Sequence, residues 1–164
     1  MKVCFIGHRT IENSTYIKTL LKEAVVLLIS QGAKDFLFGG KGEFDNLSWE
    51  VVSSLKSEYP FIKRIYIRSS YETISKQYED YLLSLYEETY FPTNLRNSGK
   101  SSYVKRNAYM IENSAYCVFY YNENYLLQPK TTKNKILLKN RNSGTKIAYK
   151  YALKKNKKII NLYY

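Results

Sequence analysis

The chain has 164 residues, 45% of them hydrophobic, and no run of 18 apolar residues, so it is long enough for one globular domain and no membrane partner is expected. The chain has two cysteines, Cys4 and Cys117, each inside an apolar run, which excludes a disulfide scaffold and a cysteine-only zinc site. Because two reduced thiols are expected and the N-terminus does not resemble a signal peptide, the sequence predicts a cytoplasmic protein. The formal net charge of +12 comes almost wholly from residues 124–164, which hold eleven Lys or Arg and no Asp or Glu.

Short apolar runs alternate with amphipathic segments along the chain. In order, the expected elements are strand 2–6, helix 14–31 capped by Asn13 or Ser14, strand 35–38, helix 45–56, strand 62–68, a helix near 78–86, a short segment at 90–91, helix 103–113, strand 115–121, a helix capped by Ser143, and strand 158–163. Strands separated by helices of this length form right-handed crossovers. The sequence therefore predicts one α/β domain over 1–164, a Rossmann-like three-layer domain with a mainly parallel sheet and helices on both faces.

A long basic loop is expected over 122–142, directly before Ser143. One hypothesis makes it a lid, whose basic side chains add affinity for anionic ligands: Lys130, Lys133, Lys135, Lys139 and Arg141. The other makes it a solvated insertion, with its charge a result of AT-rich codons. The second explanation is favoured, because the length of a loop alone costs little free energy. Regularly spaced aromatic residues, which a nucleic-acid surface would show, are also absent from the basic stretch.

Three loops at the carboxyl ends of expected strands carry the residues suited to an anionic ligand, because ligands of open parallel sheets bind at this edge. Glycines let the backbone approach a phosphate, and a helix N-terminus offers free N–H groups. The candidate ligand-binding residues are Gly7, His8 and Arg9 in the first loop, Gly39, Gly40, Gly42 and Asp45 in the second, Ser143, Gly144 and Thr145 in the third, and Arg106 on a later helix. Arg9 and Arg106 are expected to converge on one anion.

The chain offers few groups for catalysis. His8 is the only histidine, so no metal site and no serine triad is expected; it either binds phosphate or shuttles a proton. Asp45 and Glu43 are the candidate catalytic carboxylates, although Asp45 serves equally well as a helix cap.

The ordered set of motifs resembles the YpsA-like family of the SLOG superfamily. It comprises Gly7-His8-Arg9, then Gly39-Gly40-x-Gly42-x-Phe44-Asp45, then Arg106-Asn107-x-x-Met110-x-x-x-Ser114, then Ser143-Gly144-Thr145 before Tyr149 and Tyr151-Ala152. The resemblance covers nearly the whole chain and implies a pocket for a nucleotide or an ADP-ribose-type ligand. Related phosphoribohydrolases of the superfamily carry a Glu three residues after their Gly-Thr pair, where this chain has Ala148.

Three interpretations of function follow. The leading one is a module that binds or senses a nucleotide or nucleotide-derived small molecule. The second is a nucleotide-processing enzyme, an N-glycosidase or phosphoribohydrolase, which Ala148 argues against because such hydrolysis needs a carboxylate. The third is an adaptor that binds nucleic acid or protein through its basic C-terminal region. A nucleotide-like small molecule is thus the expected partner; a homo-oligomer is left open, and nucleic acid is less favoured.

Overall fold

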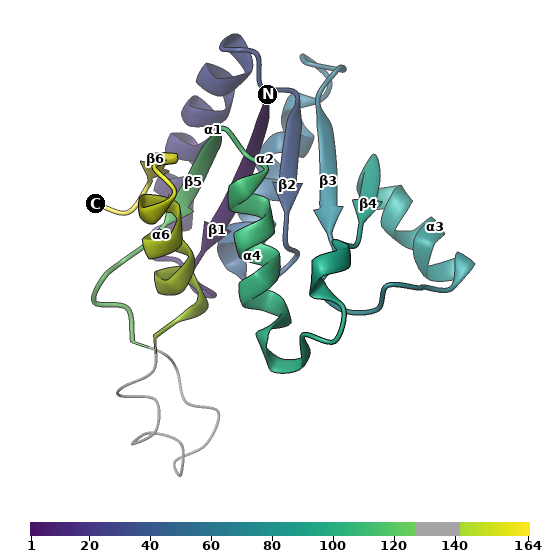
Figure 1. Ribbon diagram of the computed structural model, residues 1–164. Coiled ribbons are helices and arrows are strands. Elements are labelled where there is room, and N and C mark those ends of the chain that lie inside the picture. The colour runs from purple at the N-terminus through teal and green to yellow at the C-terminus, as the bar shows by residue number, and fades with distance from the viewer. Residues whose placement is uncertain (127–141) are drawn as a thin grey trace.

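The structure is a computed structural model that describes residues 1–126 and 142–164 (Figure 1). The five basic residues assigned to a lid, Lys130 to Arg141, lie outside the described residues. None of the helices in the described ranges is long and apolar enough to cross a membrane.

In the described part of the chain, six parallel strands form one sheet, which confirms the α/β architecture expected from the sequence. The strands are β1 (Lys2–Gly7), β2 (Asp35–Phe38), β3 (Lys63–Ile67), β4 (Glu88–Tyr90), β5 (Tyr116–Tyr120) and β6 (Lys158–Asn161). Their spatial order is β4-β3-β2-β1-β5-β6, and every neighbouring pair is parallel. The strand order reverses between β1 and β5, so a crevice is expected at their carboxyl ends.

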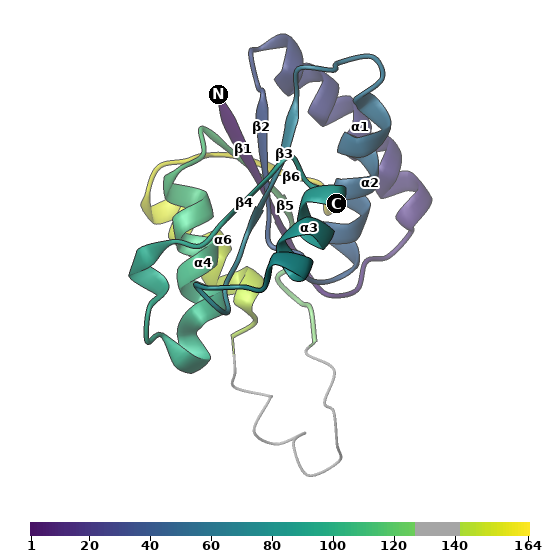
Figure 2. The ribbon, with the colours of Figure 1, turned by 90° about the vertical axis from the view of Figure 1, so that its right-hand side faces the viewer.

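Helices cover both faces of the sheet (Figure 2). On one side lie α1 (Ser14–Ser30), α2 (Glu43–Leu55) and α3 (Lys76–Leu85); on the other lie α4 (Ser102–Glu112) and α6 (Gly144–Lys154). Two short 3₁₀ helices, η1 (Thr93–Leu95) and η2 (Gly99–Ser101), connect β4 to α4. The helices begin at the edge where the strands end, as right-handed crossovers require.

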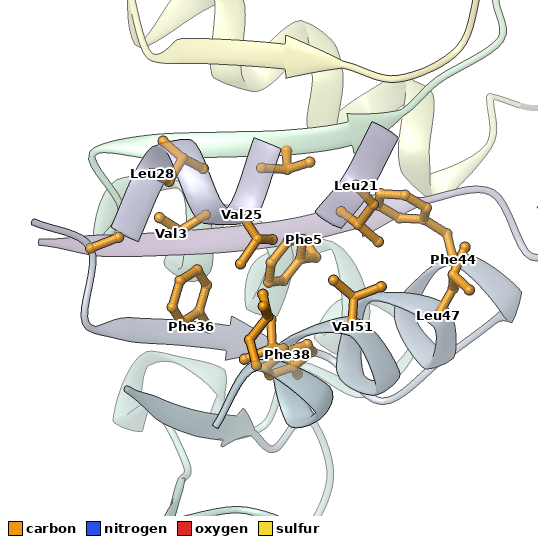
Figure 3. Packing of buried hydrophobic residues seen from close by; sticks show 14 of the residues in the cluster. Val3, Phe5, Leu21, Val25, Leu28, Phe36, Phe38, Phe44, Leu47 and Val51 are labelled. Atoms are coloured by element: carbon orange, nitrogen blue, oxygen red, sulfur yellow. The ribbon is translucent and has the colours of Figure 1, made fainter. Parts of the chain in front are cut away.

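The two faces of β1 supply two separate cores, because side chains alternate along a strand. Val3 and Phe5 pack under α1 and α2, whereas Cys4 and Ile6 pack under α4 and α6. In the first core the Phe5 ring stacks on Phe38, with centroids 5.2 Å apart (Figure 3). The apolar runs noted in the sequence are therefore strands buried on both faces.

The expected element boundaries agree with the structure to within a few residues, with two informative differences. Asn13, rather than Ser14, caps α1, and its Oδ1 accepts the Tyr16 N–H. Helix α2 begins at Glu43, two residues before the expected start, so Asp45 lies inside the first turn and is not the cap. This places the Asp45 carboxylate beside the turn that precedes the helix.

Gly7 ends β1 where α2 packs against it. A Cβ on Gly7 would lie 2.6 Å from the Cβ of Phe44, a fully buried ring. We predict that Gly7→Ala lowers the free energy of unfolding by about 1–3 kcal/mol, because the overpacked core must shift. Urea unfolding measures the loss. Gly144→Ala is the matched control: its Cβ would meet no atom within 4 Å, so stability should hold or rise slightly. Equal stability of both variants would contradict this packing.

Candidate functional site

The loops that follow β1, β2 and β5 meet at the carboxyl edge of the sheet. Thr145 Oγ1, in the first turn of α6, donates to the carbonyl of Gly7 at 2.8 Å. The N–H of Glu43 donates to the carbonyl of Arg9 at 2.8 Å, which joins the loop after β1 to the start of α2. The three glycine-containing loops identified in the sequence are therefore neighbours in space.

The peptide group between Gly39 and Gly40 lies between two buried charged side chains. Arg106 Nη1 donates to the Gly39 carbonyl at 2.6 Å, and Asp45 Oδ2 accepts the Gly40 N–H at 2.7 Å. Asp45 Oδ1 also accepts the Gly39 N–H at 3.1 Å. The cation thus meets the carbonyl end of the peptide dipole and the anion meets the N–H end, which fixes the turn after β2.

Both glycines are required by this close packing. A Cβ on Gly39 would lie 2.6 Å from Arg106 Nη2, and Gly40 has a φ of +70° with its Cβ direction blocked by the Tyr66 ring. Side chains other than glycine would therefore separate Arg106 from the carbonyl that it binds. The glycines of this turn are therefore needed for packing against the buried Arg106 and Tyr66 side chains, whether or not a ligand binds at the surface.

Arg106 is not an open anion fork. It is 6% exposed; Nη2 donates to Asn107 Oδ1 at 3.1 Å, and Nε has no partner among the described residues. Arg9, in contrast, has an exposed side chain with no ion pair recorded in the described ranges. The two guanidinium groups thus have different surroundings, and their convergence on one anion stays a prediction. The contact that Arg106 makes with the Gly39 carbonyl positions the turn.

His8 is buried at 2% exposure beneath the loop that follows β5. Its Nε2 lies 3.0 Å from the backbone nitrogen and 3.1 Å from the carbonyl oxygen of Asn122, and its ring stacks on Tyr125 with centroids 3.8 Å apart. Burial lowers the pKa of His8 to about 4, so the imidazole is neutral at pH 7. A neutral, stacked ring anchors residues 122–125 and offers no cation to a phosphate.

The remaining candidates are held by backbone contacts at the same edge. The Ser143 hydroxyl accepts the Lys146 N–H and caps α6, and Gly144 faces open space at the helix N-terminus. Gly42 precedes α2, and Glu43 Oε2 accepts the Ile11 N–H at 2.9 Å. With both Asp45 oxygens already bound, each candidate catalytic carboxylate is tied to the backbone.

A cavity of about 450 Å³ opens beside the Gly39–Gly42 turn, between the carboxyl ends of β2 and β3. We call it the β2–β3 cavity. It is lined by two cations, four tyrosines, one isoleucine and small polar residues: Lys41, Tyr66, Arg68, Ser69, Ser70, Tyr71, Thr73, Ile74, Ser75, Tyr78 and Tyr103. None of these lining residues is acidic. None of the candidate ligand-binding residues from the sequence is among these lining residues. The cavity adjoins the Gly39–Gly42 turn through Lys41.

The other residues that line the β2–β3 cavity were not predicted from the sequence. Arg68 and Ser69 directly follow a buried strand, as Gly7-His8-Arg9 does, and that position was the available signal. This loop was not singled out in the sequence because no glycine follows β3. The tyrosines come from a strand, a loop and two helices far apart in the chain, so no local pattern could have grouped them.

Contacts within the β2–β3 cavity orient its cations. Lys41 Nζ lies 4.0 Å from the centroid of the Tyr103 ring and donates to the Tyr103 hydroxyl, and this bond lowers the pKa of Tyr103. Arg68 Nη1 donates to the carbonyls of Tyr71 and Glu72, at 2.9 and 3.1 Å, which fixes its guanidinium at the cavity wall. The cavity therefore presents preorganised positive charge beside aromatic surface. No group of three or more metal-ligating side chains occurs in the described part of the chain.

Burial raises the pKa of Asp45 from 3.8 to about 6, against the opposing effects of the Gly39 N–H, Arg106 and the Gly40 N–H. The folded protein then holds a proton on Asp45 between pH 4 and 6 that the unfolded chain has released. Asp45 therefore makes stability fall as pH rises through this window, by up to about 3 kcal/mol. His8, whose pKa is lowered to about 4, acts in the opposite direction over the same window, because the unfolded chain binds that proton more readily. We therefore predict that the free energy of unfolding of wild type, minus that of Asp45→Asn, falls by up to about 3 kcal/mol between pH 4 and 6.

Urea unfolding at pH 4, 5, 6 and 7 measures the slope. Glu43→Gln is the matched control, because it removes an exposed carboxylate two residues away and should retain the wild-type slope. Equal slopes in wild type and Asp45→Asn would contradict the buried carboxylate.

Comparisons with known proteins agree with this architecture. The family model YpsA, described as the YspA SLOG family, matches residues 6–154. The chain is similar in structure to DNA processing protein A from Helicobacter pylori, a protein described by its single-stranded DNA binding mode. The TM-score is 0.59 and the sequence identity 18%, over 97% of this chain and 63% of that one. The chain thus spans less than two-thirds of that relative.

A second solved structure, the structural genomics target TM1055, is similar with a TM-score of 0.56 and 14% identity, over 96% of this chain and 71% of that one. A comparison with curated proteins finds no match. At these identities the two solved structures support the Rossmann-like fold alone, whereas the family model covers most of the sequence. The chain belongs to the YpsA family of SLOG proteins.

Proposed function

We propose that this protein binds a nucleotide or a closely related phosphorylated small molecule in the β2–β3 cavity. The observation that carries the proposal is the coincidence of Lys41, Arg68 and several tyrosines around one cavity without an acidic lining residue. Its volume of about 450 Å³ lies in the range of small-molecule sites. The proposal moves the ligand from the β1–β5 crevice to the neighbouring part of the same edge.

Each part of a nucleotide has a suitable partner in this cavity. Lys41 and Arg68 provide the positive charge for phosphate, and the serine hydroxyls of residues 69 and 70 add hydrogen-bond donors. Tyr78, 41% exposed, and Tyr103, 39% exposed, offer ring surface on which a base can stack. Tyr66 packs on Tyr86, with ring centroids 5.2 Å apart, and gives the cavity a rigid floor.

The contacts favour binding over hydrolysis. An N-glycosidase needs a carboxylate at the reacting carbon, yet both Asp45 oxygens accept backbone N–H groups and Glu43 is bound to Ile11. Ala148, where related phosphoribohydrolases carry Glu, is 3% exposed and packs in the second core. A binding or sensing role is therefore the function that these residues support best.

Nucleic acid is the alternative partner, and DNA processing protein A motivates a direct comparison. A mononucleotide fits within one cavity, whereas a single strand needs a longer cationic track. Binding to a strand weakens steeply with added salt, because many counterions are released. Measuring a thymidine oligonucleotide at two salt concentrations beside the mononucleotides separates the two partners.

We predict that wild type binds at least one of AMP, GMP, CMP and UMP, and that Lys41→Met weakens this binding about tenfold or more. The expected loss follows from removing a charge-assisted contact, worth about 1.5–3 kcal/mol. Isothermal titration calorimetry measures the affinities. Lys105→Met is the matched control, since Lys105 is exposed on α4 and does not line the cavity.

Two results would contradict the proposal. One is the absence of heat from all four mononucleotides with a correctly folded protein. The other is an equal affinity in Lys41→Met and Lys105→Met, which would leave Lys41 outside the site.

A further inference from the structure

A second cavity adjoins the β2–β3 cavity on the far side of the segment that follows β3. Its volume is about 530 Å³, and we call it the β4–α4 cavity. It is lined by Ser69, Ser70, Tyr71, Glu72, Phe91, Leu95, Arg96, Asn97, Ser98, Gly99 and Ser102. Residues 69–71 line both cavities, so one short stretch of chain forms the wall between them.

The two cavities differ in charge. The charged residues that line the β4–α4 cavity are Glu72 and Arg96, which pair with each other, with Arg96 Nε donating to Glu72 Oε2 at 2.7 Å. The β2–β3 cavity instead has Lys41 and Arg68 with no acidic lining residue. An anionic group is therefore favoured on one side of the wall, and an uncharged polar group on the other.

The chemistry of the β4–α4 cavity suits a sugar or a base. Phe91 and the buried Leu95 supply apolar surface, and hydroxyl and amide groups from residues 97, 98 and 102 supply hydrogen bonds. The buried Ser98 hydroxyl has no hydrogen-bond partner among the described residues.

The wall between the cavities is built around Tyr71. This residue has a φ of +60°, in the left-handed region that a bulky side chain rarely adopts, and its side chain is 78% exposed. Arg68 holds this conformation by donating from Nη1 to the carbonyls of Tyr71 and Glu72. Arg68 also lines the β2–β3 cavity. One side chain therefore holds the strained backbone of Tyr71 and contributes to the proposed phosphate site.

We infer that the ligand has two units joined through phosphate, with the phosphate beside Lys41 and Arg68 and the second, uncharged sugar-bearing unit in the β4–α4 cavity. The inference rests on the proposed function and narrows it from a mononucleotide to a dinucleotide-type compound. The linkage is either a pyrophosphate or a phosphodiester, and both share this arrangement of charge.

Calorimetry on the full chain tests the inference. The probes are AMP, GMP, CMP and UMP, the 5′-phosphorylated dinucleotides pApA, pGpG, pCpC and pUpU, and nicotinamide adenine dinucleotide as the pyrophosphate-linked form. We expect at least one two-unit probe to bind wild type tenfold or more tightly than the mononucleotide that shares its base. The better class of probe identifies the linkage.

Ser102→Phe fills the β4–α4 cavity from the first residue of α4 without touching the other cavity. It should bring the two-unit affinity down to that of the mononucleotide and leave mononucleotide binding unchanged. Val104→Phe is the matched control, because Val104 is 37% exposed on α4, lines neither cavity and should change neither affinity.

The outcomes separate this inference from the proposed function. If wild type binds mononucleotides but binds no two-unit probe more tightly, the inference is overturned and the proposed function stands. This result does not depend on whether the variants fold. Equal weakening of both probe classes by Ser102→Phe also overturns it. Failure of every probe to bind removes the proposed function and the inference together.

Discussion

The structure depends on how the peptide group between Gly39 and Gly40 is held. Asp45 reaches it from α2, on one face of the sheet, and Arg106 reaches it from α4, on the other. One peptide at the end of β2 therefore joins the two helical layers. Because its carbonyl faces the cation and its N–H faces the anion, neither buried charge is left without a partner. Lys41 follows directly, so this arrangement also determines where the first cation of the β2–β3 cavity stands.

The glycines at the carboxyl edge acquire a physical explanation that does not require a ligand. Gly7 leaves room for Phe44, and Gly39 leaves room for Arg106, so each permits a close contact between a loop and a helix. Such glycines resemble phosphate-binding loops in sequence because both need a backbone without side chains. In the function that we propose, the ligand contacts at this edge come instead from Lys41, Arg68 and the tyrosines that surround them.

The sequence predicted the architecture well because the relevant signals are local. Each buried strand is a short apolar run, each helix has one apolar face, and their alternation determines a parallel sheet. It also predicted that three loops meet at one edge. It could not predict that the Arg106 side chain turns inward to a carbonyl, or that Tyr66, Tyr78 and Tyr103 line one cavity, because these are tertiary contacts. With 18 tyrosines in the chain, composition gave no means of choosing among them.

We propose that ligand binds beside the Gly39–Gly42 turn and not in the crevice between β1 and β5. The most direct measurement is a crystal structure of the protein soaked with the mononucleotide that binds best in solution. We expect phosphate density within hydrogen-bonding distance of Lys41 Nζ and Arg68, with the base against Tyr78 or Tyr103. Phosphate density at the N-terminus of α6, on the Gly144 N–H and beside Arg9, with the β2–β3 cavity empty, would contradict it.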